Sequence, residues 1–254
     1  MAPRPYILAE TTWQAVKASA FEVVILPWGA TEAHNYHLPY GTDNYQCDYV
    51  AAEAARLAWE QGAKVIVLPT VPFGVNTGQL DITLDMNLNP STQLAVLRDM
   101  VRVLARQGIP KLLVLNGHGG NDFRQMLREL QAEFPAVFLC TVNLFHVVDR
   151  RRFFSAPGDH ADELETSAML HIAPQLVRPL AEAGEGVGKP FRIHALRQWA
   201  WAQREWSQVT ADTGVGNPMA ATAEKGEAFL RELTEQIGQF LVELAAADLE
   251  DMYE

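Results

Sequence analysis

Residues 29–43, GATEAHNYHLPYGTD, are the stretch around which the rest of the chain is organised. Four potential metal ligands lie within these fifteen residues, namely Glu32, His34, His37 and Asp43. Imidazole nitrogens mixed with carboxylate oxygens at this density suit a divalent metal ion such as Zn²⁺, Mn²⁺ or Fe²⁺. The alternative interpretation is a surface loop in which Asp43 caps a helix and the histidines share no task.

The flanks of this stretch predict its place in the fold. Residues 21–27 (FEVVILP) are typical of a buried strand, and the Ala-rich run at 45–59 predicts a helix capped by Thr42 or Asp43. In open α/β sheets, ligands usually bind in the loops at the carboxyl ends of parallel strands. The stretch is therefore expected at the ligand-binding edge of a sheet.

The remainder of the chain alternates between strand-like and helix-like patterns. Further strands are predicted at 64–68, 111–115 and 137–142, with a short one at 82–84. Helices are predicted near 12–19, from Asn89 to Gly108, near 123–130 and from 220 to about 249. The loop at 69–81 is long, and long loops in compact domains are often functional. This alternation predicts a single α/β domain over residues 1–254 with a mainly parallel sheet.

Composition narrows the choice of partners and compartment. The hydrophobic fraction of 48% is normal for a globular core, and the net charge of −11 argues against nucleic acid as a partner. Cys47 and Cys140 are far apart and lack CxxC spacing, which favours a reduced, cytoplasmic setting. We find neither a signal-peptide pattern nor an apolar run of membrane-spanning length, so no membrane association is expected.

A second candidate stretch, NGHGGN at residues 116–121, follows the predicted strand at 111–115. Its glycines allow a sharp turn and a close approach to a ligand, but they match neither a P-loop nor a dinucleotide fingerprint. His118 would project from the carboxyl end of its strand, as Glu32 and His34 would from theirs. The alternative is a hydrogen-bonded turn histidine.

A third candidate stretch, DHADELETS at residues 159–167, begins a predicted helix that ends near His171. Acidic residues in a first helical turn commonly serve only the helix dipole, but His160 is a residue type suited to proton transfer. The other histidines, His146, His171 and His194, are interpreted as ordinary residues. Three tryptophans could line a pocket or an interface or simply pack: Trp199, Trp201 and Trp206.

Together these stretches resemble the creatininase (creatinine amidohydrolase) family. The resemblance covers about residues 21–170 and is carried by Glu32-x-His34, by Asp43 eleven positions after Glu32, by the NGHGGN run, and by His160-Ala161 followed by Glu165-Thr166-Ser167. It implies a three-layer α/β/α fold and two divalent metal ions, Zn²⁺ first, with Mn²⁺ or Fe²⁺ as alternatives. It also implies a homo-oligomer, a hexamer built from dimers.

The resemblance implies a ligand set. Glu32, Asp43 and His118 would hold one metal ion. His34 and Asp43 would hold the second ion, so that Asp43 bridges the two.

One ligand of creatininase proper has no counterpart at its usual place. That enzyme has a further glutamate two residues after the histidine that matches His118, where this chain has Gly120. Glu165 is expected to replace it. Residues expected beside the ligands or the substrate are His37, Thr77 and Gly119.

The implied reaction is hydrolysis of a C–N bond in a small cyclic or linear amide. Two ions about 3.5–4 Å apart would share a hydroxide that attacks the carbonyl. His160 would be catalytic, passing a proton to the leaving nitrogen. Alternatives are a deformylase or peptidase that acts on a cofactor precursor, and a catalytically silent member that binds a metal or small ligand.

Three departures from the family pattern bear on the substrate. The family's common Gly-Pro between the two loop histidines is Asn35-Tyr36 here. Creatininase proper has a substrate-caging tryptophan four positions before its catalytic histidine, where this chain has Ala156. The second cage tryptophan would fall near Arg152 or Phe153. Creatinine itself is therefore not the expected substrate.

Overall fold

A four-stranded parallel sheet of order β2-β1-β3-β4 forms the centre of the computed structural model, which describes residues 3–156 and 158–254. The strands are β1 (Val23–Trp28), β2 (Val65–Val67), β3 (Lys111–Asn116) and β4 (Phe138–Asn143). Every residue of β1, β2 and β3 is buried. Continuous apolar strands of this kind are expected where helices cover both faces of a sheet.

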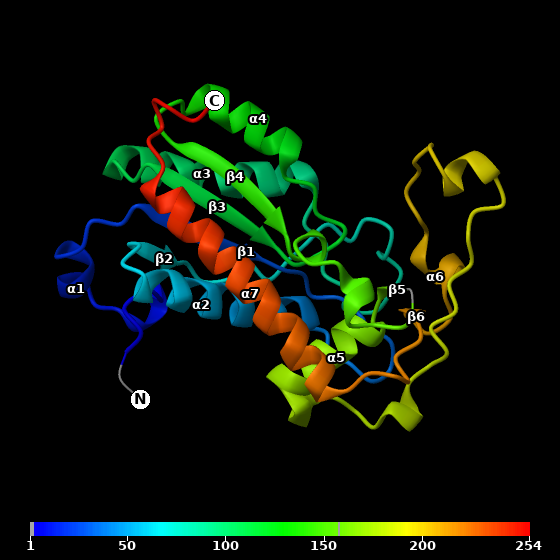
Figure 1. The fold of residues 1–254 in the computed structure, drawn as a ribbon. Helices are drawn as coiled ribbons and strands as arrows, with labels where there is room; N and C mark the ends of the chain where they lie inside the picture. Colours follow the sequence, from blue (N-terminus) through cyan, green and yellow to red (C-terminus); the bar gives the residue numbers. More distant parts are fainter. Residues whose placement is uncertain (1–2, 157) are drawn as a thin grey trace.

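Helices cover the two faces of the sheet (Figure 1). On one face lie α2 (Thr42–Glu60), α5 (Glu163–Ile172) and α7 (Ala223–Ala246), which pack on β1 side chains such as Val23 and Ile25. On the other face lie α3 (Pro90–Gln107) and α4 (Arg124–Glu133), which pack on the alternate residues Val24 and Leu26. The expected single-domain, three-layer α/β/α fold is confirmed.

Smaller elements complete the chain. A two-stranded antiparallel sheet joins β5 (Gly158–His160) to β6 (Val215–Gly216). The remaining helical turns are η1 (Leu8–Glu10), α1 (Trp13–Lys17), η2 (Leu144–His146), η3 (Arg150–Arg152), η4 (Pro174–Leu176), η5 (Leu180–Glu182), η6 (His194–Arg197) and α6 (Trp206–Val209). In Figure 1 the yellow segment that carries η6 stands away from the layers, with α6 at its base near β5 and β6. None of the described helices combines the length and apolarity needed to cross a bilayer.

Two local predictions are wrong. Residues 82–84 form turns and not a strand, because Leu84 has a φ of 64°, a left-handed conformation that ends extended structure. The N-cap of α2 is Gly41 and neither Thr42 nor Asp43. The Thr42 hydroxyl instead donates to the carbonyl of Pro39, and the Asp43 carboxylate faces two histidines.

The order of the strands creates a crevice between β1 and β3. From β1 the chain turns to α2 on one face of the sheet, whereas from β3 it turns to α4 on the opposite face. Adjacent parallel strands whose connections diverge in this way leave a crevice at their carboxyl ends, where α/β proteins bind ligands. Residues 29–43 and 116–121 both begin at this crevice.

Candidate metal centre

The three candidate stretches meet at the crevice. Glu32 and His34 follow β1, Asp43 lies in the first turn of α2, and His118 follows β3. From the opposite side, the β5–α5 connection brings in His160 and Glu165, which completes the set of residues predicted as ligands and proton carrier. The exposed fractions of these residues are all between 0% and 7%, so their charges interact with little screening by water.

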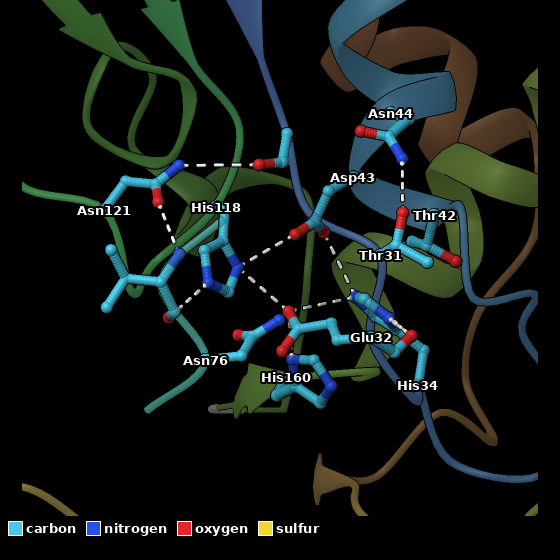
Figure 2. Close-up of polar contacts among 12 residues, drawn as sticks. Thr31, Glu32, His34, Thr42, Asp43, Asn44, Asn76, His118, Asn121 and His160 are labelled. Atoms are coloured by element: carbon cyan, nitrogen blue, oxygen red, sulfur yellow. Dashed lines mark hydrogen bonds and ion pairs between the residues drawn. The ribbon is translucent and has the colours of Figure 1, made fainter. Parts of the chain in front are cut away.

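Glu32, Asp43 and His118 form one group that could hold a metal ion, with ligand atoms within 4.8 Å of one another. Nδ1 of His118 lies 2.9 Å from a Glu32 oxygen and 3.0 Å from Oδ2 of Asp43. Figure 2 shows these side chains pointing toward one another. Imidazole and carboxylate atoms that converge on a common point offer the nitrogen and oxygen donors that zinc and related ions bind.

A second group consists of His34, Asp43 and Glu165, again within 4.8 Å. Nε2 of His34 lies 3.1 Å from Oδ1 of Asp43 and 3.9 Å from Oε2 of Glu165. Asp43 therefore directs one oxygen to each group. A carboxylate placed in this way has the geometry needed to bridge two cations.

Neighbouring carbonyls select which ring nitrogen of each histidine faces the centre. Nε2 of His118 lies 3.1 Å from the Val75 carbonyl, and Nδ1 of His34 lies 3.1 Å from the Glu32 carbonyl. A carbonyl can only accept, so the proton of each neutral ring belongs on that nitrogen. Nδ1 of His118 and Nε2 of His34 are then free to act as ligands, which is the usual way that an outer hydrogen bond orients a metal-binding histidine.

Hydrogen bonds hold the Val75 carbonyl in place. The Asn121 side chain accepts from the Val75 N–H at 3.0 Å and from Gln93 at 2.8 Å, and donates to Asn116 at 3.0 Å. Figure 2 shows Asn121 beside His118. The second asparagine of NGHGGN thus joins the His118 loop to the loop at 69–81.

Without a cation, the carboxylates of the centre stabilise the protonated forms of its imidazoles. Burial opposes a charged His34, but the carboxylates of Asp43 and Glu165 raise its pKa to about 10. Burial likewise opposes a charged His118, yet Glu32 and Asp43 keep its pKa well above the usual range. Burial is also the main cause that raises the pKa of Glu165 to about 8. These shifts favour the protonated forms of His34, His118 and Glu165. A divalent cation would displace these protons on binding.

His160 lies beside the two groups and differs from their histidines. Its Nε2 lies 2.8 Å from the Ala33 carbonyl, and its Nδ1 lies 3.8 Å from Glu32. Its ring is 4.1 Å from the His34 ring and meets the Trp206 ring edge-on at 5.4 Å. Burial and the neighbouring His34 lower the pKa of His160. A neutral ring with Nδ1 toward the centre can accept a proton there.

Gly120 lies where creatininase proper has a glutamate, and the structure shows why a side chain does not fit. A Cβ at Gly120 would come within 2.3 Å of the Val75 carbonyl oxygen and 2.5 Å of Nε2 of His118. A side chain would push these two groups apart. Glu165 reaches the centre from α5 and lies in a group with His34 and Asp43 that could hold a metal ion.

We expect Gly120→Ala to lower the free energy of unfolding by about 1–3 kcal/mol, the usual cost of overpacking, and to weaken metal binding through His118. The matched control is Gly119→Ala, because a Cβ at Gly119 meets nothing within 4 Å. That control should change stability by less than about 0.5 kcal/mol. Denaturant unfolding and metal titration of both variants check this, and equal effects at the two positions would contradict it.

The other residues predicted near the site occupy different positions. His37 is buried, its Nε2 lies 2.8 Å from the Thr166 hydroxyl, and burial lowers its pKa to about 4. Its polar contact is therefore with the residue that follows Glu165 and not with a ligand side chain. Thr77 and Gly119 line the cavity above the centre.

Asn35 explains one departure from the family pattern. It has a φ of 55°, a left-handed conformation that glycine and asparagine tolerate best. Its side-chain oxygen accepts from the Gly184 N–H at 2.7 Å, and its own N–H donates to the Thr213 hydroxyl at 2.8 Å. Asparagine at this place keeps the turn between His34 and His37 and ties it to the region after α5.

Sequence reasoning missed several residues that support the centre. Gln79 is buried and donates to Glu32 at 2.5 Å, and the Asp85 carboxylate accepts from the Ala33 N–H at 2.6 Å. His160 contacts the Ala33 carbonyl, so Ala33 is held through both its N–H and its carbonyl. The only sequence signal was the length of the loop at 69–81, which contains Gln79 but does not single it out.

We expect Gln79→Ala to weaken metal binding by roughly 10- to 100-fold, because outer hydrogen-bond partners of ligands typically matter to this extent. Gln203→Ala is the control, since Gln203 lines the same cavity and contacts Thr77, not a ligand. Calorimetric titration with Zn²⁺ measures both. Unchanged affinity in Gln79→Ala would show that Glu32 needs no such support.

A cavity of about 730 Å³ opens over the centre. Its inner end is formed by acidic and imidazole groups, and its sides come from the loops after β3 and β4 and from residues 201–206. Pockets of roughly 300–1,000 Å³ hold drug-sized ligands. The cavity therefore has room for a molecule considerably larger than one small ring.

Buried carboxylates and imidazoles at the crevice of a three-layer α/β/α fold define the class, that of α/β proteins with a candidate metal centre. Residues 9–241 match the creatininase family model, described as creatinine amidohydrolase. The chain therefore belongs to the creatininase family of amidohydrolases.

Known proteins similar to this chain differ in their described activities. A mycofactocin precursor peptide peptidase of Mycobacterium ulcerans is 27% identical over 85% of this chain and 83% of its own length. The creatinine amidohydrolase of Pseudomonas putida is 27% identical over 67% of this chain and 73% of its own. The solved structure of a provisionally named creatinine amidohydrolase from Bacteroides fragilis is 45% identical, covers 98% of this chain and 99% of its own, and has a TM-score of 0.92.

Solved creatininases that share the fold include a zinc form at 24% identity and a manganese form at 23% identity. Likeness at this level concerns the fold alone.

Proposed function

We propose that this protein is a dinuclear metal-dependent amidohydrolase that cleaves the C–N bond of an amide. The observation that carries the proposal is the position of Asp43, which directs one carboxylate oxygen to each of two ligand groups. A single structural ion pair would need neither the second group nor the buried Glu165. Zn²⁺ suits the mixed nitrogen and oxygen donors, and Mn²⁺ or Fe²⁺ are alternatives.

In this proposal Glu32, Asp43 and His118 hold one ion, and His34, Asp43 and Glu165 hold the other. When bound, such a pair of ions polarises a carbonyl and lowers the pKa of water, which makes amide hydrolysis accessible near neutral pH. The cavity over the centre has room to bring the carbonyl of a substrate to these ligand groups.

His160 carries the proton. With Nε2–H fixed on the Ala33 carbonyl, Nδ1 is the atom that takes a proton from the attacking water and gives it to the leaving nitrogen. Contact with the His34 and Trp206 rings limits rotation of the imidazole. Geometry and a lowered pKa together fit a group that is neutral before the reaction begins.

A second candidate within the enzyme class is a peptidase that acts on a short peptide. Two observations favour it, namely the cavity of about 730 Å³ and the likeness to a mycofactocin precursor peptide peptidase. The chemistry at the centre would be the same, since a peptide bond is also an amide. The two candidate functions would differ in the size of the substrate group that lies beyond the scissile bond.

The test is turnover by protein loaded separately with Zn²⁺, Mn²⁺ or Fe²⁺, measured on lactams, hydantoins, formamides and short peptides. We expect hydrolysis of at least one class, abolished by a chelator and restored by metal. Two bound ions per chain by elemental analysis are part of the expectation. Stoichiometric metal binding without turnover of any amide would instead identify a silent metal-binding member.

Creatinine should be hydrolysed poorly or not at all. Ala156 replaces a cage tryptophan and does not line the cavity, and Phe153 packs at 5.7 Å on the Phe229 ring of the core. A small planar ring would therefore lack the two aromatic walls expected from this region. Comparing creatinine with the best amide of the panel checks this, and comparable kcat/KM values would contradict it.

A further inference from the structure

One wall of the cavity comes from a segment that lies outside the family motifs. The segment 201–206 lines the cavity with residues 201–204 and Trp206, although the three candidate stretches all end before residue 170. The two tryptophans differ sharply, because Trp206 is 6% exposed and Trp201 is 84% exposed. Trp206 packs on His160, whereas Trp201 presents its indole at the mouth of the cavity without a covering side chain in the described structure.

Contacts on two sides fix this wall. The backbone N–H of Trp206 donates to the Gly78 carbonyl at 2.8 Å, and the Thr77 hydroxyl donates to the side-chain oxygen of Gln203 at 3.2 Å. A Cβ at Gly78 would lie 2.1 Å from the Arg204 carbonyl, so the glycine permits this close approach. These bonds tie residues 201–206 to the loop that also orients Glu32 and His118.

An ion pair also fixes the cavity wall at residues 201–206 to the segment beside His160. Arg204 pairs with Asp159 at 2.6 Å, beside His160, and its guanidinium stacks on the Trp206 ring at 4.5 Å. The indole of Trp201 is thus attached to a backbone that is held at the cavity, and not to a free loop. Its exposure leaves a flat apolar surface turned toward water at the place where substrate enters.

We propose that Trp201 is a specificity-determining residue that stacks on a planar, apolar group of the amide substrate. This rests on the proposed function. Aromatic groups gain from stacking beyond the area they bury, and an exposed indole provides that surface at low conformational cost. The wall at 201–206 then supplies what Ala156 lacks, from another part of the chain. The substrate class is an amide with an aryl or similarly flat substituent, large enough to reach from the centre to the mouth.

The test compares two hydroxamate probes on Zn²⁺-loaded protein, benzohydroxamate with a flat ring and acetohydroxamate without one. Both probes present the same chelating group, so the ratio of their affinities reports how much the ring contributes to binding. We expect wild type to favour benzohydroxamate and Trp201→Ala to reduce that preference by roughly fivefold to tenfold. The matched control is Trp199→Ala, because Trp199 is 81% exposed on the same segment but does not line the cavity.

The outcomes separate this proposal from the proposed function. Trp201→Phe should keep most of the preference, since a flat ring remains. Equal binding of both probes by wild type, or equal loss in Trp199→Ala and Trp201→Ala, overturns the role of Trp201 while the metal centre stands. If neither probe binds protein shown to hold metal, the centre is closed to ligands and both proposals fall.

Discussion

Replacing Asp43 with alanine should remove both metal ions and all amide hydrolysis. Asp43 is the one carboxylate shared by the two ligand groups, with separate oxygens 3.0 Å from His118 and 3.1 Å from His34. Its loss leaves each group with only two members. We expect affinity for Zn²⁺ to fall by more than about 100-fold, which is the upper end of the effect of losing an outer partner of a ligand.

The metal-free fold should survive this substitution. Asp43 lies in the first turn of α2, and its backbone continues the helix. The substitution removes a carboxylate that raises the pKa of His34 and of His118, so the metal-free variant should unfold at the same temperature as metal-free wild type or somewhat lower. Metal-loaded wild type should lie above both, because a ligand that binds only the native state stabilises it.

Elemental analysis, Zn²⁺ titration and thermal unfolding of the same preparations check this result. Asp48→Ala is the control, since Asp48 lies on the same helix but is exposed and bonds to Thr70. It should retain two ions and full activity. One ion retained at full affinity in Asp43→Ala would show that Asp43 does not bridge, and that one group binds without it.

His160→Ala should keep its metal and lose turnover by roughly 10²–10⁴-fold, the contribution expected of general acid–base catalysis. His160 belongs to neither ligand group that contains Asp43, and its Nε2 is occupied by the Ala33 carbonyl. A third possible group, made of Glu32, His34 and His160, would instead make it a ligand. Metal content therefore distinguishes the two roles directly.

Added imidazole should partly restore activity to His160→Ala, because the cavity opens at the ring's position and a free base can enter. His194→Ala serves as the control, since His194 lies in η6 and does not line the cavity. If His160→Ala loses metal as fully as Asp43→Ala, His160 is a ligand. If it retains both metal and full turnover, another group carries the proton, and the buried His37, which contacts Thr166, is the next candidate.

Much of the fold could be predicted because the signals are local. Apolar runs such as 111–115 predicted buried parallel strands, and helical periodicity between them predicted the covering layers. The structure agrees at β1, β2, β3 and β4, with shifts of one or two residues at their ends. The prediction failed at 82–84, where the left-handed Leu84 ends a run of strand-forming residues.

Sequence spacing by itself determined which residues meet at the crevice. Glu32, His34 and Asp43 lie within one strand–loop–helix connection, and His118 follows the neighbouring strand, so the parallel arrangement alone brings them together. Only the tertiary structure decided how they are oriented. The carbonyls of Val75 and Ala33 that select the ring nitrogens carry no signal in the sequence, since any residue type has a carbonyl.

The cavity wall was likewise decided only by tertiary structure. Gln79 reaches Glu32 across 47 residues of sequence, and Trp206 meets His160 across a separation of 46, which is 206 minus 160. The position of Trp206 depends on how residues 201–206 dock against the loop at 69–81, and no local pattern encodes that. The sequence thus determined the chemistry available at the centre, whereas the packing of distant segments decided its orientation and the shape of the substrate that can reach it.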